Sequence, residues 1–416
     1  MTKMTGLWGP ILCCTVVLCS APAFAAGPYE TPTDRRASES LPAELRSGPH
    51  FTVQEHVQAD GYMLRYTVTS EYGTFAVTGE SGLRKLIREI EAIAALKRMS
   101  KGEAFAKGVG GKAQETLEFG ANLVTEPGRT LASVPQGVAK LFDNLATGMQ
   151  KPAEPRRDRV GEQLLNVSEA KRKLAYELGV DVYSSNRVLQ RELESLSKAQ
   201  ALGSLGVSAA IPYGGGTVVG LSRMSQTAGE INRLLRDESP SGLRNLNERK
   251  LQAMGVDRGI AERFLNHLQL SPRHKTIMVA SLEKLAGARG REAVVQFVCQ
   301  AHDEDSATFM QNLTEILAAY HQTVSPLREV TAPGIILARA ANGTILIPFP
   351  LDYGVWTPRA DRVVTGTLAG YRTPDGQPAR YEFWVTGAVS PLARRQLEAR
   401  GIPVKEGMGR RLALMI

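Results

Sequence analysis

Residues 334–348, which read GIILARAANGTILIP, decide the fold class of this chain. Two apolar runs, at 335–337 and 344–347, flank the dipeptide Asn342-Gly343, and this dipeptide between apolar runs is the strongest short signal of a β-hairpin. Strands are therefore predicted after Ser325-Pro326. Because the preceding sequence has a helical pattern, the chain is predicted to be an α+β protein with separate helical and strand-rich regions.

The sequence after this hairpin predicts more strands around one helix. Residues 381–386 form an apolar strand pattern, and Ser390-Pro391 supplies an N-cap and a first-turn proline for a helix that ends at Gly401. Residues 402–405 are extended again. Residues 325–416 are therefore predicted to form a β-rich C-terminal domain with one β-α-β unit.

Residues 161–324 are predicted to form a large all-α middle domain. The segments LGVD (178–181) and MGVD (254–257) each place a glycine where a helix ends and an aspartate where the next helix begins. Ser271-Pro272 marks the start of another helix. The repeated pairing of a helix-ending glycine with a helix-capping residue indicates helical hairpins.

The N-terminal part is predicted to be a small antiparallel sheet with one helix. Residues 51–78 alternate apolar and polar side chains around a turn at Asp60-Gly61. Ser81 is a suitable cap for a helix whose apolar residues recur over 83–96. Its charged residues are expected to face water, namely Arg84, Lys85, Arg88, Glu89 and Glu91.

Two further segments complete the predicted organisation. An irregular helical segment is expected to follow the helix, so that this unit spans residues 51–150. Residues 151–160 contain Pro152 and Pro155 in a charged run, which favours a linker to the helical domain.

The first 25 residues have the pattern of a cleavable signal peptide. Lys3 precedes an apolar run at 11–18, and Ala23-Phe24-Ala25 places small residues at the two positions that a signal peptidase reads. The run is far shorter than the roughly 20 residues of a spanning helix. We expect export to the periplasm or the cell exterior, cleavage before Ala26, and a disordered leader over 26–50.

Cysteine usage follows from this prediction. Three of the four cysteines lie in the signal peptide, so the mature chain keeps only Cys299 and no internal disulfide is expected. Cys299 follows an apolar helical pattern and is predicted to be buried.

Positive charge is concentrated near the C-terminus. The whole chain carries +8, and residues 359–416 hold ten Arg and Lys against five Asp and Glu. Such a surface outside the cytoplasm suggests another envelope protein, anionic lipid or wall polymer as a partner. Aromatic residues are too sparse for a nucleic-acid groove. The candidate contact residues are Arg394, Arg395, Arg410 and Arg411.

Motifs for catalysis, cofactors and metals are weak or incomplete. Ser-x-x-Lys begins at Ser168, Ser195 and Ser281, always in a charged helical pattern and without a Lys-Thr-Gly partner. The six histidines lack metal-ligand spacing, and residues 302–305 are better explained as a helix start than as a cation site. The loop at 107–113 lacks the features of a phosphate-binding loop. No catalytic residue, cofactor or metal is predicted.

An uncharged stretch, residues 199–222, leaves two interpretations open. It contains Gly214, Gly215, Gly216 and Gly220, which suit a glycine loop between buried helix ends. A membrane-contacting segment with close helix packing is the alternative. Trp356 and Trp384 are expected to fill the C-terminal core, with a sugar-stacking surface as the alternative.

The preferred functional hypothesis is a non-catalytic envelope protein that binds a partner or an anionic surface through its basic C-terminal domain. One alternative is an envelope hydrolase whose residues are distant in sequence, with Asp352, Tyr353 and His321 as candidates. A second alternative is a membrane-inserting protein that uses residues 199–222.

Overall fold

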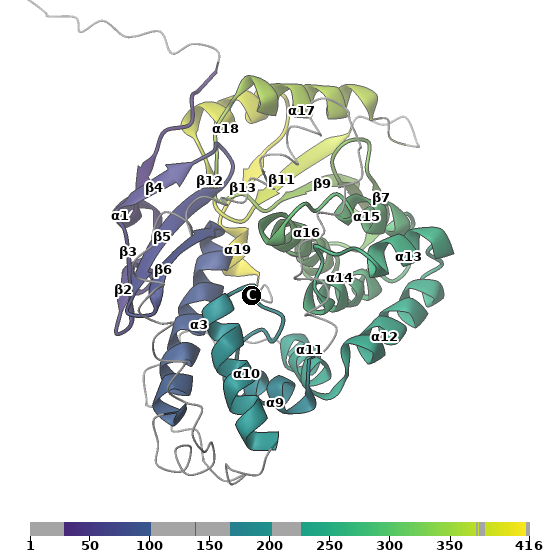
Figure 1. Cartoon of the computed structure of the whole chain (residues 1–416). Coiled ribbons are helices and arrows are strands. Elements are labelled where there is room, and N and C mark those ends of the chain that lie inside the picture. Colours follow the sequence, from purple (N-terminus) through teal and green to yellow (C-terminus); the bar gives the residue numbers. More distant parts are fainter. Residues whose placement is uncertain are drawn as a thin grey trace, which may run out of the picture.

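The structure is a computed structural model that describes residues 29–100, 138, 167–201, 226–371, 373 and 379–412. It confirms the α+β class: an antiparallel sheet comes first, helices follow, and a mixed sheet forms the C-terminal region (Figure 1). The predicted signal peptide (1–25) and linker (151–160) lie outside the described residues. So do most of the predicted irregular segment and the four glycines Gly214, Gly215, Gly216 and Gly220.

The N-terminal sheet has six strands in the order β1-β4-β5-β3-β2, with β6 paired to β5. Along β5, Leu64, Tyr66 and Val68 are buried while the residues between them are more exposed, as the alternating sequence predicted. The strands are β1 (Arg35–Arg36), β2 (Ser47–Gly48), β3 (Phe51–Val53), β4 (His56–Ala59), β5 (Leu64–Ser70) and β6 (Gly73–Thr78).

The disordered leader predicted for residues 26–50 is wrong from residue 29 onward. This part of the chain contributes β1 and β2 to the sheet, together with the short helices α1 (Ala37–Ser40) and α2 (Ala43–Arg46). Ala37, Leu41 and Leu45 are buried against the sheet. Ala37 lies in α1, Leu45 lies in α2, and Leu41 lies in the extended link between the two helices, so the high proline and charge content obscured three scattered apolar residues.

The start of the described chain is also tied to the C-terminal region. There, the backbone N–H of Glu30 donates a hydrogen bond to the backbone C=O of Trp356 at 2.8 Å. The Glu30 carboxylate accepts from Trp356 N at 2.8 Å and from the Ser390 hydroxyl at 2.5 Å. The start of the described chain is therefore bound to the C-terminal region.

Helix α3 (Gly79–Ser100) joins the N-terminal sheet to the helical middle. Its first half buries Leu83, Ile87 and Ile90 against the sheet. Its second half contributes Ile93 and Leu96 to a separate apolar cluster with residues from α9, α10, α11, α12 and α14 of the middle region. The helix thus belongs to both units, and its charged residues lie between them.

The middle region is helical, as predicted. Gly179 and Gly255 have the left-handed backbone that ends a helix, and Asp257 and Ser271 cap the helices that follow them. Asp181 differs from the prediction, because the next helix begins only at Arg187. The helices are α9 (Glu169–Glu177), α10 (Arg187–Ala201), α11 (Gln226–Asp237), α12 (Pro240–Ala253), α13 (Arg258–Leu265), α14 (Pro272–Lys284), α15 (Arg291–Val298) and α16 (Glu304–Thr323).

The C-terminal sheet has the order β13-β11-β9-β8-β7. The hairpin around Asn342-Gly343 is confirmed by the antiparallel pairing of β8 and β9, and Gly343 has a φ of 83°. The elements are β7 (Leu327–Thr331), β8 (Leu337–Ala340), β9 (Thr344–Phe349), β10 (Tyr353–Gly354), α17 (Pro358–Gly370), β11 (Arg380–Val385), β12 (Ala388–Val389), α18 (Pro391–Glu398), β13 (Val404–Lys405) and α19 (Met408–Arg411).

This sheet contains two β-α-β units rather than the predicted one. The predicted unit is confirmed, because β11 and β13 are parallel and α18 connects them. In addition, β9 and β11 are parallel with α17 between them. The apolar residues of α17 are few, with Val363 buried and Val364 half-buried, so its sequence gave a weak helical pattern.

The sheet packs on both faces. Trp384 of β11 stacks edge-on against Tyr320 of α16, with ring centroids 4.9 Å apart, whereas the neighbouring Phe383 faces α17 and α18. Trp356 and Trp384 are both buried, which confirms that they fill the core. One apolar cluster runs from the helices α12–α16 into this sheet, across the predicted boundary at 324, and includes buried Cys299.

Candidate functional site

A group of contacting polar and ionisable side chains lies between α3 and the segments that face it, and it is the candidate functional site. We call this region the polar seam. On one side lie Thr78, Ser81, Lys85 and Glu89, from the end of β6 and from α3. On the other side lie the loop 181–186, the start of α14, the first turns of α16, and Asp352.

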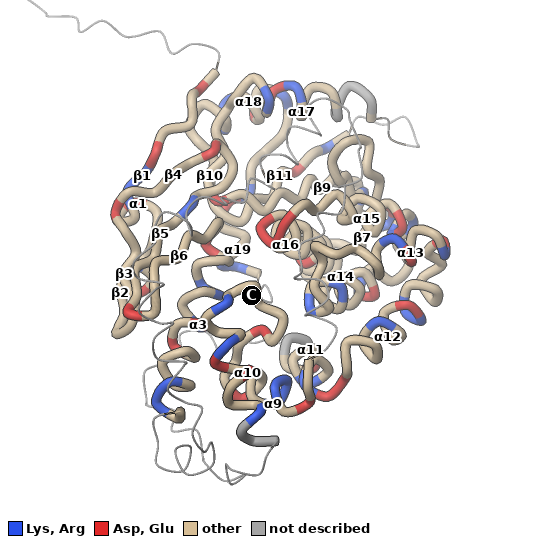
Figure 2. The backbone as a smooth tube through the Cα atoms, in the orientation of Figure 1, with Lys and Arg blue, Asp and Glu red and all other residues tan. Residues whose placement is uncertain are grey.

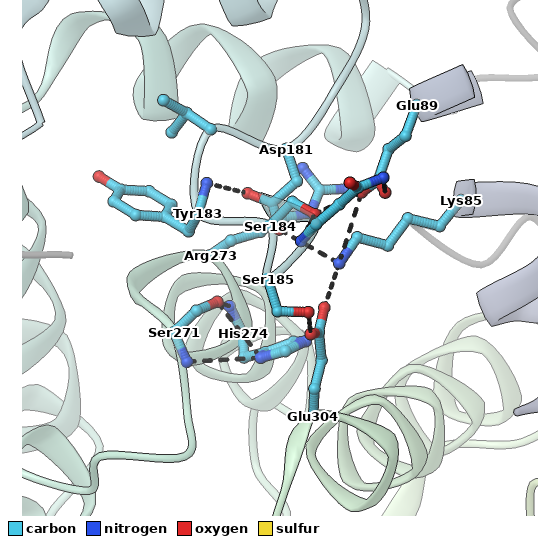
Figure 3. A network of polar contacts seen from close by, with 12 residues as sticks. Lys85, Glu89, Asp181, Tyr183, Ser184, Ser185, Ser271, Arg273, His274 and Glu304 are labelled. Atoms are coloured by element: carbon cyan, nitrogen blue, oxygen red, sulfur yellow. Dashed lines mark hydrogen bonds and ion pairs between the residues drawn. The ribbon is translucent and has the colours of Figure 1, made fainter. Parts of the chain in front are cut away.

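Lys85 is the centre of the first half of the seam, which we call the lysine network (Figure 3). Its ammonium group forms an ion pair with Glu304 and lies 3.8 Å from Glu89 Oε1 and 4.0 Å from Asp181 Oδ2. Burial opposes the charge of Lys85, but these three carboxylates together raise its pKa above the ordinary value. Lys85 is therefore held as a cation.

Hydroxyl and amide groups complete the network. The Ser184 hydroxyl donates to Glu89 Oε1 at 2.6 Å, Asn186 Nδ2 donates to Glu89 Oε2 at 3.0 Å, and the Ser185 hydroxyl donates to Glu304. Burial raises the pKa of Glu89, although Lys85 and both of its hydrogen-bond donors act in the opposite direction. Burial also opposes ionisation of Glu304, but Lys85 and Ser185 outweigh it and lower its pKa to about 2.

His274 borders the network and is uncharged. It is only 6 % exposed, and burial, reinforced by the charge of Lys85, lowers its pKa to about 4. Its Nδ1 lies 3.2 Å from the Ser271 hydroxyl, which resembles a serine–histidine pair. However, the buried Ser271 hydroxyl accepts a hydrogen bond from His274 N as the N-cap of α14, so it is not accessible to a substrate.

These protonation states decide what the lysine network can do. A general base must be able to take up a proton and a general acid must be able to release one near the working pH. Lys85 stays protonated and Glu304 stays ionised, so neither meets that requirement. The network instead connects α3 to the loop 181–186 and to α16.

The second half of the seam is a small polar hollow, which we call the aspartate hollow. It has a volume of about 20 Å³ and lies where α3 begins, where α16 begins and where β9 has ended. Its polar side chains come from four segments of the chain. They are Thr78, Ser81, Asp305, Thr308, Asn312, Asp352 and Thr386.

Both carboxyl groups of the aspartate hollow resist ionisation. Burial raises the pKa of Asp352 to about 7, although its oxygens accept hydrogen bonds from Leu64 N at 2.9 Å and Glu80 N at 3.2 Å. Burial likewise raises the pKa of Asp305 to about 7, against the effect of a hydrogen bond with Thr78. Two carboxyl groups poised near neutrality are thus found in one hollow.

A second cavity is apolar and lies between α17, α18 and the C-terminal sheet. Its volume is about 50 Å³, and its walls include Phe383, Val363 and Leu397. Ligand pockets are usually several hundred Å³ and have convergent polar groups. This cavity is therefore a packing gap in the core rather than a site for catalysis.

The residues considered for a hydrolase do not come together. His321 lies near the end of α16 and its Nδ1 accepts a hydrogen bond from Leu327 N at 3.0 Å. Asp352 lies near Asp305 at the start of the same helix. Sixteen residues of helix separate the two positions by roughly 24 Å. Tyr353 is engaged elsewhere, with the Arg35 guanidinium 4.1 Å from its ring centroid.

The four candidate arginines lie in two places. Arg394 is bound to Glu406 at 2.5 Å, while Arg395, Arg410 and Arg411 are exposed. Helices α18 and α19 are well separated, and basic segments are seen at both (Figure 2). The predicted single basic surface is thus two smaller ones.

Sequence reasoning missed the seam. Lys85 and Glu89 were expected to face water, but Glu89 is only 3 % exposed because the loop 181–186 covers it. The start of α16 at residues 302–305 was correctly predicted, and the structure shows that Asp303 is its cap. The only local signal of the seam in the sequence was the presence of Lys85 and Glu89 within the amphipathic pattern of α3.

Comparisons with known proteins, and searches of the described residues for a metal-binding group and a membrane-spanning helix, found no match. No family model, no curated protein and no solved structure matches this chain. The described residues contain no group of three or more His, Cys, Asp or Glu side chains that could hold a metal ion. No helix among them has both the length and the apolar character needed to cross a membrane.

Proposed function

We propose that this chain is a non-catalytic binding or scaffold protein of the cell envelope, and that its basic C-terminal region contacts an anionic partner or surface. The observation that carries the proposal is the state of Arg395, Arg410 and Arg411. All three are exposed, and none forms an ion pair with another residue in the described ranges. Arginines without a carboxylate partner keep their full attraction for an external anion.

The contrast with Arg394 supports this choice. Its guanidinium group is neutralised by Glu406 and lies 4.0 Å from Glu398, so it has less charge to offer. The binding residues are therefore Arg395 on α18 and the pair Arg410 and Arg411 on α19. A partner that contacts both places must be extended, whereas a membrane surface can contact them only in a suitable orientation.

The hydrolase alternative receives less support than the binding hypothesis. His321 and Asp352 are far apart, and Lys85 and Glu304 of the lysine network have protonation states unsuited to acid–base work. The membrane-inserting alternative concerns residues 199–222 and stays a prediction, because nearly all of that segment lies outside the described residues.

The test is co-sedimentation of the full chain with phosphatidylglycerol-containing vesicles and with pure phosphatidylcholine vesicles. Binding to the anionic vesicles alone, reversed by moderate salt, is expected. Sedimentation is the better readout because Trp356 and Trp384 are buried and would report surface contact poorly. Salt-resistant binding would instead favour the inserting alternative.

A charge-matched control makes the test specific. The variant Arg395→Gln/Arg410→Gln/Arg411→Gln should bind at least tenfold more weakly, since each cation near an anionic surface contributes about 1 kcal/mol. The control removes three exposed, carboxylate-paired cations outside the C-terminal region: Lys173→Gln/Lys198→Gln/Arg258→Gln. Equal binding by the two triple variants, or no binding by the parent, would refute the proposal.

A further inference from the structure

The aspartate hollow has a composition that differs from the lysine network beside it. Every polar atom that its side chains can present is an oxygen, apart from the amide nitrogen of Asn312. The hollow is about 20 Å³, enough for one water-sized group but not for an organic ligand. Its ligand must therefore be a single water molecule or a single ion.

Asn312 supplies an observation that is independent of the carboxyl groups. Its side chain is only 6 % exposed, and Nδ2 donates to the Ser81 hydroxyl at 3.3 Å. Its Oδ1 is buried and has no hydrogen-bond partner. A buried acceptor without a partner is costly, and such atoms in folded proteins generally require an unseen water or ion.

The two carboxyl groups also form no ion pair within the described ranges, although the positive charge of Arg65 favours the ionised form of Asp305. Neither Asp305 nor Asp352 forms an ion pair with another described residue, whereas Glu304, next to Asp305, is paired with Lys85. The hydrogen bonds that Asp352 accepts from Leu64 N and Glu80 N use one oxygen each. Each oxygen of a carboxylate has two lone pairs, so acceptor capacity remains on both.

We propose that the aspartate hollow binds a single Ca²⁺ ion, with Asp305, Asp352 and the Asn312 Oδ1 as protein ligands. The donor set selects a hard cation, because carboxylate, amide and hydroxyl oxygens suit Ca²⁺ and there is no thiolate or imidazole. Ca²⁺ fits better than Mg²⁺ because it tolerates irregular coordination by six to eight oxygens. Two carboxylates give a weak site, with a Kd on the order of 10⁻⁴ to 10⁻³ M.

The experiment is a calorimetric titration of the chelator-treated full chain with Ca²⁺, and with Mg²⁺ for comparison. One Ca²⁺ per chain should bind, and Mg²⁺ should bind more weakly. Asp305→Asn and Asn312→Ala should each weaken Ca²⁺ binding at least tenfold. Glu262→Gln, which removes an exposed carboxylate paired with Arg258, should leave it unchanged.

Asn312→Asp keeps the proposal testable if the weakening variants unfold. It adds a third carboxylate to the hollow and should tighten Ca²⁺ binding, since affinity follows the charge of the ligands. Circular dichroism confirms that each variant is folded. The proposal is overturned if the parent binds no Ca²⁺ at 10 mM, or if binding is the same in Asn312→Ala, Asn312→Asp and the parent.

Discussion

The lysine network and the aspartate hollow lie side by side at the start of α16, and they shift the pKa values of two half-buried carboxyl groups in opposite directions. Glu304 points to Lys85 and accepts a hydroxyl hydrogen bond from Ser185, so its pKa falls to about 2. Asp305, the next residue, forms no ion pair with a described residue, and burial raises its pKa to about 7 although the charge of Arg65 acts in the opposite direction. The pKa values of these two adjacent residues thus differ because different segments of the chain contact their side chains.

The difference teaches which part of the seam stabilises the fold. A buried carboxylate with a partner is costly to disturb, since removal of one partner leaves an uncompensated charge. A buried carboxylate without a partner costs stability whenever it is ionised. The lysine network is therefore the half of the seam that stabilises the fold. The aspartate hollow is the half whose carboxyl groups can still bind a ligand.

Lys85→Met should have the largest effect on stability. It leaves Glu89, Asp181 and Glu304 without their cation, and loss of one partner of a buried pair typically costs about 3–5 kcal/mol. Urea unfolding measures the change. The matched control is Lys198→Met, whose ion pair with Glu194 is exposed and whose loss should cost less than about 1 kcal/mol. Similar costs for both variants would contradict the distinction.

The pH dependence of stability should have opposite signs for Glu304 and Asp305. The lowered pKa of Glu304 gives stability that is present above pH 4.5 and lost as the pH falls toward 2. The raised pKa of Asp305 gives stability that is present below pH 3.8 and lost as the pH rises through 7, by at most about 1.4 kcal/mol per pH unit.

Unfolding of the chelator-treated parent, Glu304→Gln and Asp305→Asn at a series of pH values tests this pair. Glu304→Gln should lose less stability than the parent on acidification below pH 5. Asp305→Asn should lose less than the parent between pH 4 and 7. Parallel pH profiles for all three proteins would show that the two carboxyl groups have the same environment.

Ser184→Ala should have an intermediate effect. It removes the 2.6 Å hydrogen bond to the buried Glu89 carboxylate, and loss of a hydrogen bond to a charged group costs about 1.5–3 kcal/mol. Ser38→Ala is the control, because its hydroxyl donates to the exposed Glu55 carboxylate and water can replace it. A thermal melt that ranks Ser38→Ala as the more damaging change would reverse the expectation.

Asn312→Ala should have the smallest effect when measured in chelator. The side chain makes one long hydrogen bond and leaves its Oδ1 unsatisfied, so its removal should change the free energy of unfolding by less than about 1 kcal/mol. Urea unfolding with and without Ca²⁺ measures it. A loss as large as that of Ser184→Ala would place Asn312 with the structural half of the seam.

The sequence predicted the elements whose signals are local. Alternation at residues 51–78, the Asn342-Gly343 hairpin, the helix start at residues 302–305, and the caps at Ser271 and Ser390 are all confirmed, because each depends on neighbours within a few residues. The second β-α-β unit was missed because α17 has few buried residues.

The seam could not be predicted because its contacts are remote. Lys85 and Glu304 are 219 residues apart, and nothing near either one in the sequence indicates the other. Glu89 looked like a solvent-facing residue of an amphipathic helix until the loop 181–186 was placed over it. The basic character of the C-terminal region was correctly noted. The sequence did not show that its arginines are divided between two places, because α18 connects the paired strands β11 and β13 whereas α19 follows β13.

The position of Glu30 has a consequence for the order of events during chain synthesis. Its carboxylate is bound by Trp356, 326 residues later, and by Ser390. At about 5–20 residues per second, those 326 residues take roughly 16 to 65 s to appear. The Glu30 carboxylate must wait that long for its binding place, whereas Ala37, Leu41 and Leu45 pack in an apolar cluster whose buried members all lie within residues 37–90.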